Sequence, residues 1–124
     1  MAFGQSRFEE TNALLNAKFA EKKVLICAHR GSWHGNVIQN TTIAYRAALM
    51  QGADIVETDT TASRDGIVFS LHDGVEWRLF GTPRSGLKLT AAQLESFHPL
   101  NALGEPSTHN IQRLSEVCEF LTPG

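Results

Sequence analysis

The sequence lacks both a long hydrophobic run and a block of basic residues. No stretch of the 124-residue chain reaches the about eighteen consecutive apolar residues that a membrane-spanning helix requires, and its opening, MAFGQSRFEETN, holds no apolar segment typical of a secretory signal. Thirteen acidic and eleven basic residues are interspersed and give a net charge of −2. This balance argues against a nucleic acid or another polyanion as partner. We therefore expect a cytoplasmic protein without a membrane span.

Cysteine is also scarce, and the two cysteines lie far apart. Cys27 falls within an apolar run and Cys118 within a pattern of helical spacing. That placement favours two reduced thiols packed in the core over a disulfide. With 42% apolar and 19% charged residues, the composition is ordinary for a globular chain, and we find no repeat or domain linker. One core and one domain are expected.

The chain alternates between helical and strand patterns, which indicates an α/β sheet built from crossover units. An unbroken apolar run such as residues 24–28 is typical of a strand buried on both faces of a parallel sheet. Asn40 or Thr41 is the expected cap of the second helix, whose buried stripe should hold Ile43, Ala47 and Met50. Periodicity is lost from residue 73 to residue 89. Helices are expected over residues 7–22, 42–51, 89–97 and 113–121, and strands over residues 24–28, 53–62 and 67–71.

Four titratable side chains lie at the carboxyl ends of the expected strands. His29 follows the first strand, Glu57 and Asp59 lie in the second, and His72 follows the third. In α/β barrels and open sheets, the carboxyl ends of parallel strands are where ligands bind. Each histidine taken singly could be an ordinary hydrogen-bonded residue. The four together predict a functional site at this edge.

Glu57 and Asp59 are two residues apart, so on a strand both side chains point to the same face. Two carboxylates that face one point repel each other unless a cation joins them, and oxygen ligands suit Mg²⁺ or Ca²⁺ better than zinc. Surface acids on a solvated strand edge are the alternative. Arg30 supplies a planar donor fork suited to a phosphate or a carboxylate, and its alternative is a salt bridge to Glu57 or Asp59.

Several other aromatic and basic residues have less defined contexts. Trp33 and Trp77 could form the wall of a pocket or pack partly buried against the core. For His34, His98 and His109 we identify no partner, and a surface role is favoured.

Three segments resemble the glycerophosphodiester phosphodiesterase family in order and spacing. They are AHRG at residues 28–31, QNTTIAYRAALMQGADIVETD at residues 39–59, and SRDGIVFSLHD at residues 63–73. The resemblance implies a (β/α)₈ TIM barrel in which residues 24–72 carry the strand-end motifs. Residues 73–112 would then form a small insertion, followed by a helix over residues 113–121.

The activity that the resemblance implies is metal-dependent hydrolysis of sn-glycerol 3-phosphate diesters to glycerol 3-phosphate and an alcohol. His29 and His72 would be the general base and acid pair, and Arg30 would bind the phosphate. Glu57 and Asp59 would bind Mg²⁺ or Ca²⁺. The implied partner is therefore a small-molecule glycerophosphodiester.

Two departures from the family pattern stand out. The family commonly has Glu where this chain has Gln39, whose carbonyl oxygen can still contact a metal or the substrate. A further metal-binding glutamate of the family would lie on a strand after residue 124. A whole barrel needs about 250 residues, so we expect this chain to be a single partial domain holding the first half, with three to four strands.

An isolated half-barrel would expose strand edges and an apolar face. We therefore expect a truncated product, or a chain that associates with itself or with a second chain to complete the barrel. Two other functions remain open. One is a noncatalytic half-barrel that oligomerises or binds a phosphodiester without turning it over. The other is a two-histidine, metal-dependent phospholipase, which the lack of an apolar or basic membrane-facing segment disfavours.

Overall fold

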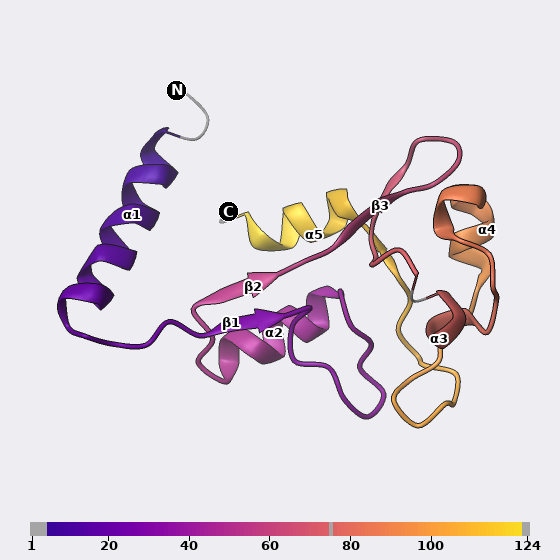
Figure 1. Cartoon of the computed structure of the whole chain (residues 1–124), viewed down its shortest axis with the longest axis horizontal. Coiled ribbons are helices and arrows are strands. Elements are labelled where there is room, and N and C mark those ends of the chain that lie inside the picture. The colour runs from indigo at the N-terminus through magenta and orange to yellow at the C-terminus, as the bar shows by residue number, and fades with distance from the viewer. Residues whose placement is uncertain (1–4, 75, 123–124) are drawn as a thin grey trace.

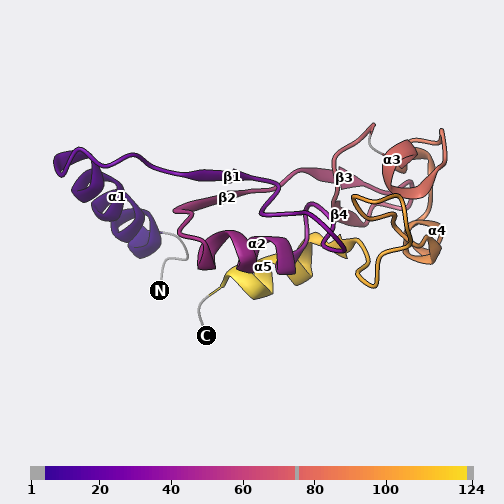
Figure 2. The ribbon, with the colours of Figure 1, turned by 90° about the horizontal axis from the view of Figure 1, so that it is seen from below.

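The structure, a computed structural model, describes residues 5–74 and 76–122. The chain begins with α1 (Gln5–Ala20), a helix that starts and ends two residues earlier than the expected range of 7–22. Figures 1 and 2 show α1 standing apart from the remaining elements. An ion pair between Lys18 and Asp54 connects α1 to the residue that precedes β2 (Ile55–Glu57). Phe8 and Phe19 of this helix remain exposed to solvent.

A parallel two-stranded sheet is formed by β1 (Cys27–His29) and β2, and α2 (Thr42–Met50) is the crossover helix between them. The strand expected over residues 24–28 begins later, and its burial on both faces was wrongly predicted. Val24 and Ile26 are 83% and 54% exposed. The physical reason is visible in Figure 2, where α2 and α5 (Leu114–Leu121) lie on one side of these strands and the described chain places nothing on the other.

Local sequence signals predict where α2 begins, but they do not predict which face of this helix is buried. The Thr41 hydroxyl accepts a hydrogen bond from the Ala44 amide, which confirms Thr41 as the cap. The expected buried stripe was wrong, because Ile43 and Met50 are 38% and 82% exposed. The helix instead turns Ala44, Tyr45 and Ala48 inwards. The loop after β1 accounts for this rotation, since the Ser32 amide donates to the Ala44 carbonyl and so brings that face of α2 against the loop.

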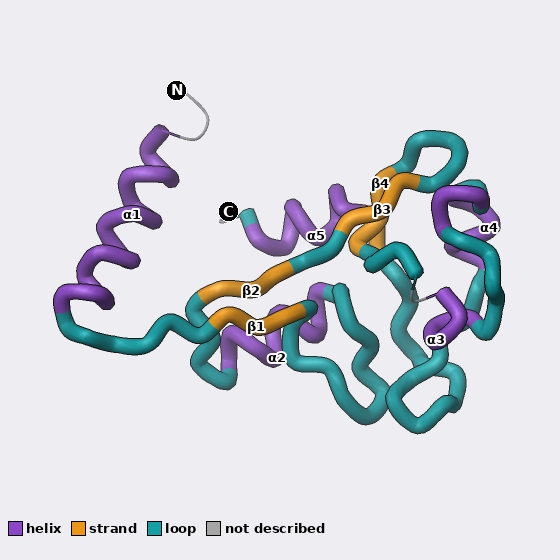
Figure 3. The backbone as a smooth tube through the Cα atoms, viewed as in Figure 1, coloured by secondary structure: helices purple, strands orange, loops and turns teal. Residues whose placement is uncertain are grey.

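A second sheet has the order β3 (Thr60–Ala62), β4 (Val68–Ser70) and β5 (Gln112–Arg113), with antiparallel pairs. The strand expected over residues 53–62 is therefore two strands separated at Thr58 and Asp59 (Figure 3). Because β4 runs antiparallel to β3, the parallel edge predicted for three strands exists only for β1 and β2.

The turn between β3 and β4 connects this hairpin to α4 (Ala91–Ser96) through one carboxylate. Asp65 Oδ1 accepts hydrogen bonds from Ser63 Oγ at 2.7 Å and from the Ala91 amide at 2.8 Å. These hydrogen bonds, that of Ser63 above all, lower the pKa of Asp65. The short turn and α4 are thereby held as one unit.

Residues 73–89, expected to lack regular structure, contain the short helix α3 (Glu76–Phe80) and the 3₁₀ turn η1 (Gly86–Lys88). Thr90 caps α4 in a reciprocal box with Gln93, as its sequence predicts. The hydrophobic core joins β4 and its neighbours to these elements and not to β1. It consists of Ile38, Phe69, Leu71, Leu79, Leu89, Ala91, Leu94 and Ile111.

Both cysteines are exposed, so their predicted packing in the core was wrong. Cys27 lies on the uncovered sheet of β1 and β2, and α5 buries only Val117 among its own residues. Within the described residues, no helix is long and apolar enough to cross a membrane. The described strands form two small sheets and do not close into a barrel.

Candidate active site

The carboxyl ends of β1 and β2 bring His29 beside Glu57. The parallel register pairs these two residues directly, and the His29 side chain is exposed. After His29 the chain turns sharply, since Arg30 has a φ of +60°. In this conformation the Arg30 amide donates a hydrogen bond to Glu57 Oε2 at 3.1 Å. The turn thus points one backbone donor at the first of the two predicted metal ligands.

The Arg30 side chain contacts two further predicted site residues. Its Nε lies 2.9 Å from Asp59 Oδ2 in an ion pair, and its Nη1 donates to Gln39 Oε1 at 2.6 Å. The side chains of Arg30 and Asp59 are only 15% and 20% exposed. The salt bridge considered as the alternative for Arg30 is therefore present, with Asp59 as partner. Gln39, where the family commonly has Glu, presents its carbonyl oxygen to the guanidinium.

Asn40 holds Asp59 from two sides and was considered from sequence only as a helix cap. Its Nδ2 donates to Asp59 Oδ2 at 3.1 Å, and its Oδ1 accepts from the Asp59 amide at 3.1 Å. Its own amide donates to the Arg30 carbonyl. Asn40 is 1% exposed and has a φ of +57°, a conformation that asparagine tolerates better than most residues. The only sequence signal for this role was its position between two site motifs.

Tyr45 lies beneath Asn40 and centres a buried polar cluster that sequence reasoning missed. Its hydroxyl lies 2.7 Å from Thr58 Oγ1, 3.0 Å from Ser70 Oγ and 3.3 Å from Asn40 Oδ1. The Tyr45 side chain is fully buried, and this burial raises its pKa above 10.0. The available signal was the pair of hydroxyl residues Thr58, which follows β2, and Ser70, which ends β4.

Replacing Tyr45 with phenylalanine is expected to lower the free energy of unfolding by about 1–2 kcal/mol, the usual loss for a buried hydroxyl. Thr58 and Ser70 keep their mutual 2.7 Å hydrogen bond, so the loss stays limited. Because the pKa of Tyr45 is raised on folding, its contribution is present below pH 10 and is lost as the pH rises above that value. Urea unfolding at pH 8 and pH 10.5 measures both effects. An equal alkaline decrease in the wild type and Tyr45→Phe would contradict this role.

His72 follows β4, and the backbone of the preceding residue, Leu71, connects it to Asp59. The Leu71 amide donates to the Asp59 carbonyl at 3.1 Å, so the backbone that carries His72 runs beside Asp59. The His72 side chain is half-buried, and its Nδ1 is buried without a hydrogen-bond partner among the described residues. Such an atom is unusual in a folded protein. An antiparallel strand therefore brings His72 to the edge where a parallel one was expected.

The donor set fits a hard cation only in part. Within residues 5–74 and 76–122, no cluster of three or more His, Cys, Asp and Glu side chains could hold a metal. Mg²⁺, however, is commonly bound by one or two carboxylates together with water and substrate phosphate oxygens. Glu57 and Asp59, joined through Arg30, are two such carboxylates at one strand edge. They fit a metal site of this kind.

The remaining aromatic and histidine predictions have mixed outcomes. Trp33 is 41% exposed and lines a pocket next to Gln39. The Trp77 side chain lies outside the described residues. His34 and His98 are exposed, in agreement with a surface role, and His109 is half-buried.

Comparison with solved structures defines the class of fold. A glycerophosphoryl diester phosphodiesterase of Parabacteroides distasonis superposes with a TM-score of 0.68 and 21% identity, over 77% of this chain and 34% of that one. The glycerophosphodiester phosphodiesterase of Thermotoga maritima gives a TM-score of 0.60 and 30% identity, over 80% of this chain and 40% of that one. The prediction of a partial (β/α)₈ TIM barrel is confirmed: the chain has the fold of part of such a barrel.

Comparison of sequences then defines the family. Residues 29–123 match the Glycerophosphoryl diester phosphodiesterase family. A glycerophosphodiester phosphodiesterase of Arabidopsis thaliana is 43% identical over 63 residues, which are 46% of this chain and 17% of that protein. The chain belongs to the Glycerophosphoryl diester phosphodiesterase family, and it spans less than half the length of these relatives.

Proposed function

We propose that this chain carries catalytic residues of a glycerophosphodiester phosphodiesterase, which hydrolyses sn-glycerol 3-phosphate diesters to glycerol 3-phosphate and an alcohol. The observation that carries the proposal is the contact of Arg30 with Glu57, Asp59 and Gln39 beside the exposed His29. A guanidinium fork beside Asp59, with Glu57 held by the backbone amide of the same arginine, suits a phosphate diester and a metal together. Family membership and the names of the relatives from Arabidopsis and Thermotoga add support.

Glu57 and Asp59 are the proposed ligands of a divalent cation, Mg²⁺ or Ca²⁺. When bound, the cation would withdraw charge from a nonbridging phosphate oxygen. Arg30 binds the same phosphate and offsets negative charge that develops during the reaction. For this the guanidinium exchanges a present contact, with Asp59 or Gln39, for a phosphate oxygen. Gln39 is the proposed further contact, because its carbonyl oxygen already orients Arg30 Nη1 at 2.6 Å.

His29 and His72 are the proposed proton-transfer pair. One imidazole removes a proton from the attacking water, whose oxygen forms a bond to phosphorus. The other donates a proton to the departing alkoxide as its bond to phosphorus breaks. The exposure of His29 leaves its ring open to such a substrate, and the half-buried His72 has an Nδ1 atom that lacks a hydrogen-bond partner among the described residues.

Glycerol 3-phosphate release from glycerophosphocholine tests the proposal directly. The chain is incubated with Mg²⁺, with Ca²⁺ or with a chelator, and its molecular mass is recorded by light scattering. The mass matters because an active site completed by association requires an oligomer or a second chain. Release that depends on the cation supports the proposal. No release from a folded chain with either cation, whether from glycerophosphocholine or from the glycerophosphodiester of a neutral alcohol, would contradict catalysis by this chain and favour the noncatalytic half-barrel.

Replacing Glu57 with glutamine is expected to weaken divalent-cation binding by at least about tenfold, since even loss of an outer-shell partner has an effect of that size. Glutamine keeps an oxygen that can accept from the Arg30 amide, so the turn after β1 is preserved. Isothermal titration calorimetry with Mg²⁺ and Ca²⁺ measures the change. Glu9→Gln, on the exposed surface of α1, is the matched control. Equal affinities for Glu57→Gln and the wild type would remove Glu57 from the metal site.

A further inference from the structure

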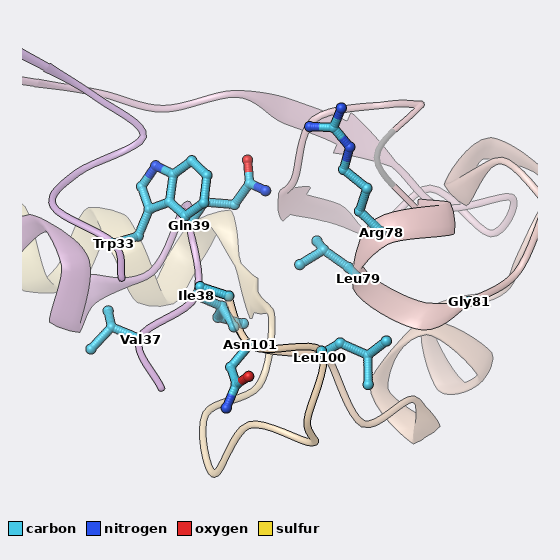
Figure 4. Close-up of a pocket in the computed structure, with 11 residues that line it drawn as sticks. Trp33, Val37, Ile38, Gln39, Arg78, Leu79, Gly81, Leu100 and Asn101 are labelled. Atoms are coloured by element: carbon cyan, nitrogen blue, oxygen red, sulfur yellow. The ribbon is translucent and has the colours of Figure 1, made fainter. Parts of the chain in front are cut away.

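We infer that the pocket lined by Gln39, the hydrogen-bond partner of Arg30, binds the alcohol portion of the diester and selects apolar, uncharged alcohols; this inference rests on the proposed function. The pocket has a volume of about 510 Å³ and lies between the loop after β1 and residues of the 73–112 segment. Figure 4 shows Trp33 and Gln39 on one side and Leu79 of α3 on the other. This volume lies within the range of small-molecule sites.

The lining is predominantly apolar. Aliphatic and aromatic side chains form most of its wall, namely those of Trp33, Val37, Ile38, Leu79, Leu100 and Ala102. A glycerol group placed here would lose water from its two free hydroxyls and find few partners, at a cost in affinity. An aliphatic or aromatic alcohol gains affinity from the same burial. The pocket therefore suits the alcohol side of an apolar diester and not its glycerol side.

Gln39 connects this pocket to the proposed phosphate site. The residue lines the pocket, and its Oε1 accepts the 2.6 Å hydrogen bond from Arg30 Nη1. A phosphate on the Arg30 guanidinium would consequently lie at the edge of the pocket. One ester arm can then enter the pocket while the other remains near the strand edge with His29 and Glu57.

Hydrogen bonds between the two walls hold the pocket open before any ligand binds. Asn36 Nδ2 donates to Thr108 Oγ1 at 2.6 Å, and Ser107 Oγ donates to the Asn36 carbonyl at 2.6 Å. The Ala102 amide donates to the Gly35 carbonyl at 3.2 Å. A wall that is already ordered spares a ligand the entropy cost of arranging it.

Charge adds a second element of selection. Arg78 lines the pocket opposite Trp33, and its side chain is exposed. A permanent cation there disfavours positively charged head groups such as choline or ethanolamine. Neutral alcohols meet no such repulsion. The pocket thus favours an uncharged apolar alcohol over the polar, cationic ones.

Calorimetric titration of the chain with methyl phosphate, hexyl phosphate and n-hexanol tests the inference without requiring turnover. Each fully buried methylene is worth about fourfold in affinity, so hexyl phosphate should bind at least about tenfold more tightly than methyl phosphate. Trp33→Ala should remove most of this preference, and Trp33→Phe should retain it. Phe19→Ala, which removes an exposed aromatic ring on α1, is the control and should change nothing.

The outcomes separate this inference from the proposed function. Equal binding of methyl and hexyl phosphate would overturn the apolar pocket and leave the phosphate site at Arg30 standing. Binding of n-hexanol that Trp33→Ala abolishes, without binding of either phosphate, would support the pocket and contradict the phosphate site. A hexyl preference that Trp33→Ala leaves intact would overturn the inference, and circular dichroism confirms that each variant is folded.

Discussion

Replacing His72 with alanine is expected to lower the rate of glycerol 3-phosphate release by about two to four orders of magnitude, the usual contribution of a general acid or base. His29→Ala should have an effect of the same size, because the reaction needs both proton transfers. Initial rates with glycerophosphocholine and saturating Mg²⁺ measure the loss. The prediction applies to the form of the protein, single chain or assembly, that shows cation-dependent release in the wild type.

The control for this prediction is His98→Ala, which removes an exposed histidine outside the proposed site. The His72→Ala chain should also fold normally, because the buried Nδ1 of His72 has no hydrogen-bond partner in the described structure that the substitution would remove. Urea unfolding checks this point. A His72→Ala variant that retains the wild-type rate would exclude His72 from the mechanism.

Replacing Gly31 with alanine is expected to lower the free energy of unfolding by about 2–4 kcal/mol, which combines backbone strain with a steric clash. Gly31 has a φ of +84°, and a Cβ atom there would lie 2.7 Å from the Ala44 backbone carbon. Relief requires α2 or the loop after β1 to shift, and backbone atoms yield less easily than a side chain. Urea unfolding of the wild type and variant gives the difference.

Gly35→Ala separates the two causes. Gly35 also has a positive φ, +58°, but a Cβ atom there would meet nothing within 4 Å. Its replacement should cost only the strain of a left-handed residue, about 1–2 kcal/mol. If both variants lose the same free energy of unfolding, the close approach of Gly31 to α2 does not contribute to the loss. A larger loss for Gly31→Ala supports the steric account.

Features encoded by neighbouring residues could be predicted from the sequence. Thr41 caps α2 and Thr90 caps α4 because a hydroxyl bonds an amide only three residues away. Glu57 and Asp59 both contact Arg30, but Asp59 lies between β2 and β3, so the strand spacing that predicted a shared face does not apply to it. Their roles in binding metal and phosphate remain predictions.

Features that depend on distant packing could not be predicted. Val24 and Cys27 have the apolar pattern of a buried strand, yet the described elements cover only one face of it. The split between β2 and β3 depends on Asn40, which binds Asp59 across nineteen positions of sequence. No local pattern specifies such a partner. The same holds for Tyr45, whose hydroxyl connects α2 to Thr58, which follows β2, and to Ser70 of β4.

Because the hydrophobic core lies to one side of the molecule, stability against local unfolding differs along the chain. Leu71 and Leu94 belong to this core, whereas the exposed apolar side chains of α1 contribute little to it. Local opening of α1 therefore requires far less free energy than opening of β4. The proposed site lies between the exposed and the buried parts of the chain. His29 is on the exposed strand β1, and Asn40 connects the end of that strand to the buried cluster around Tyr45. Contacts made to β1 by any further segment or chain would thus act directly on the placement of His29.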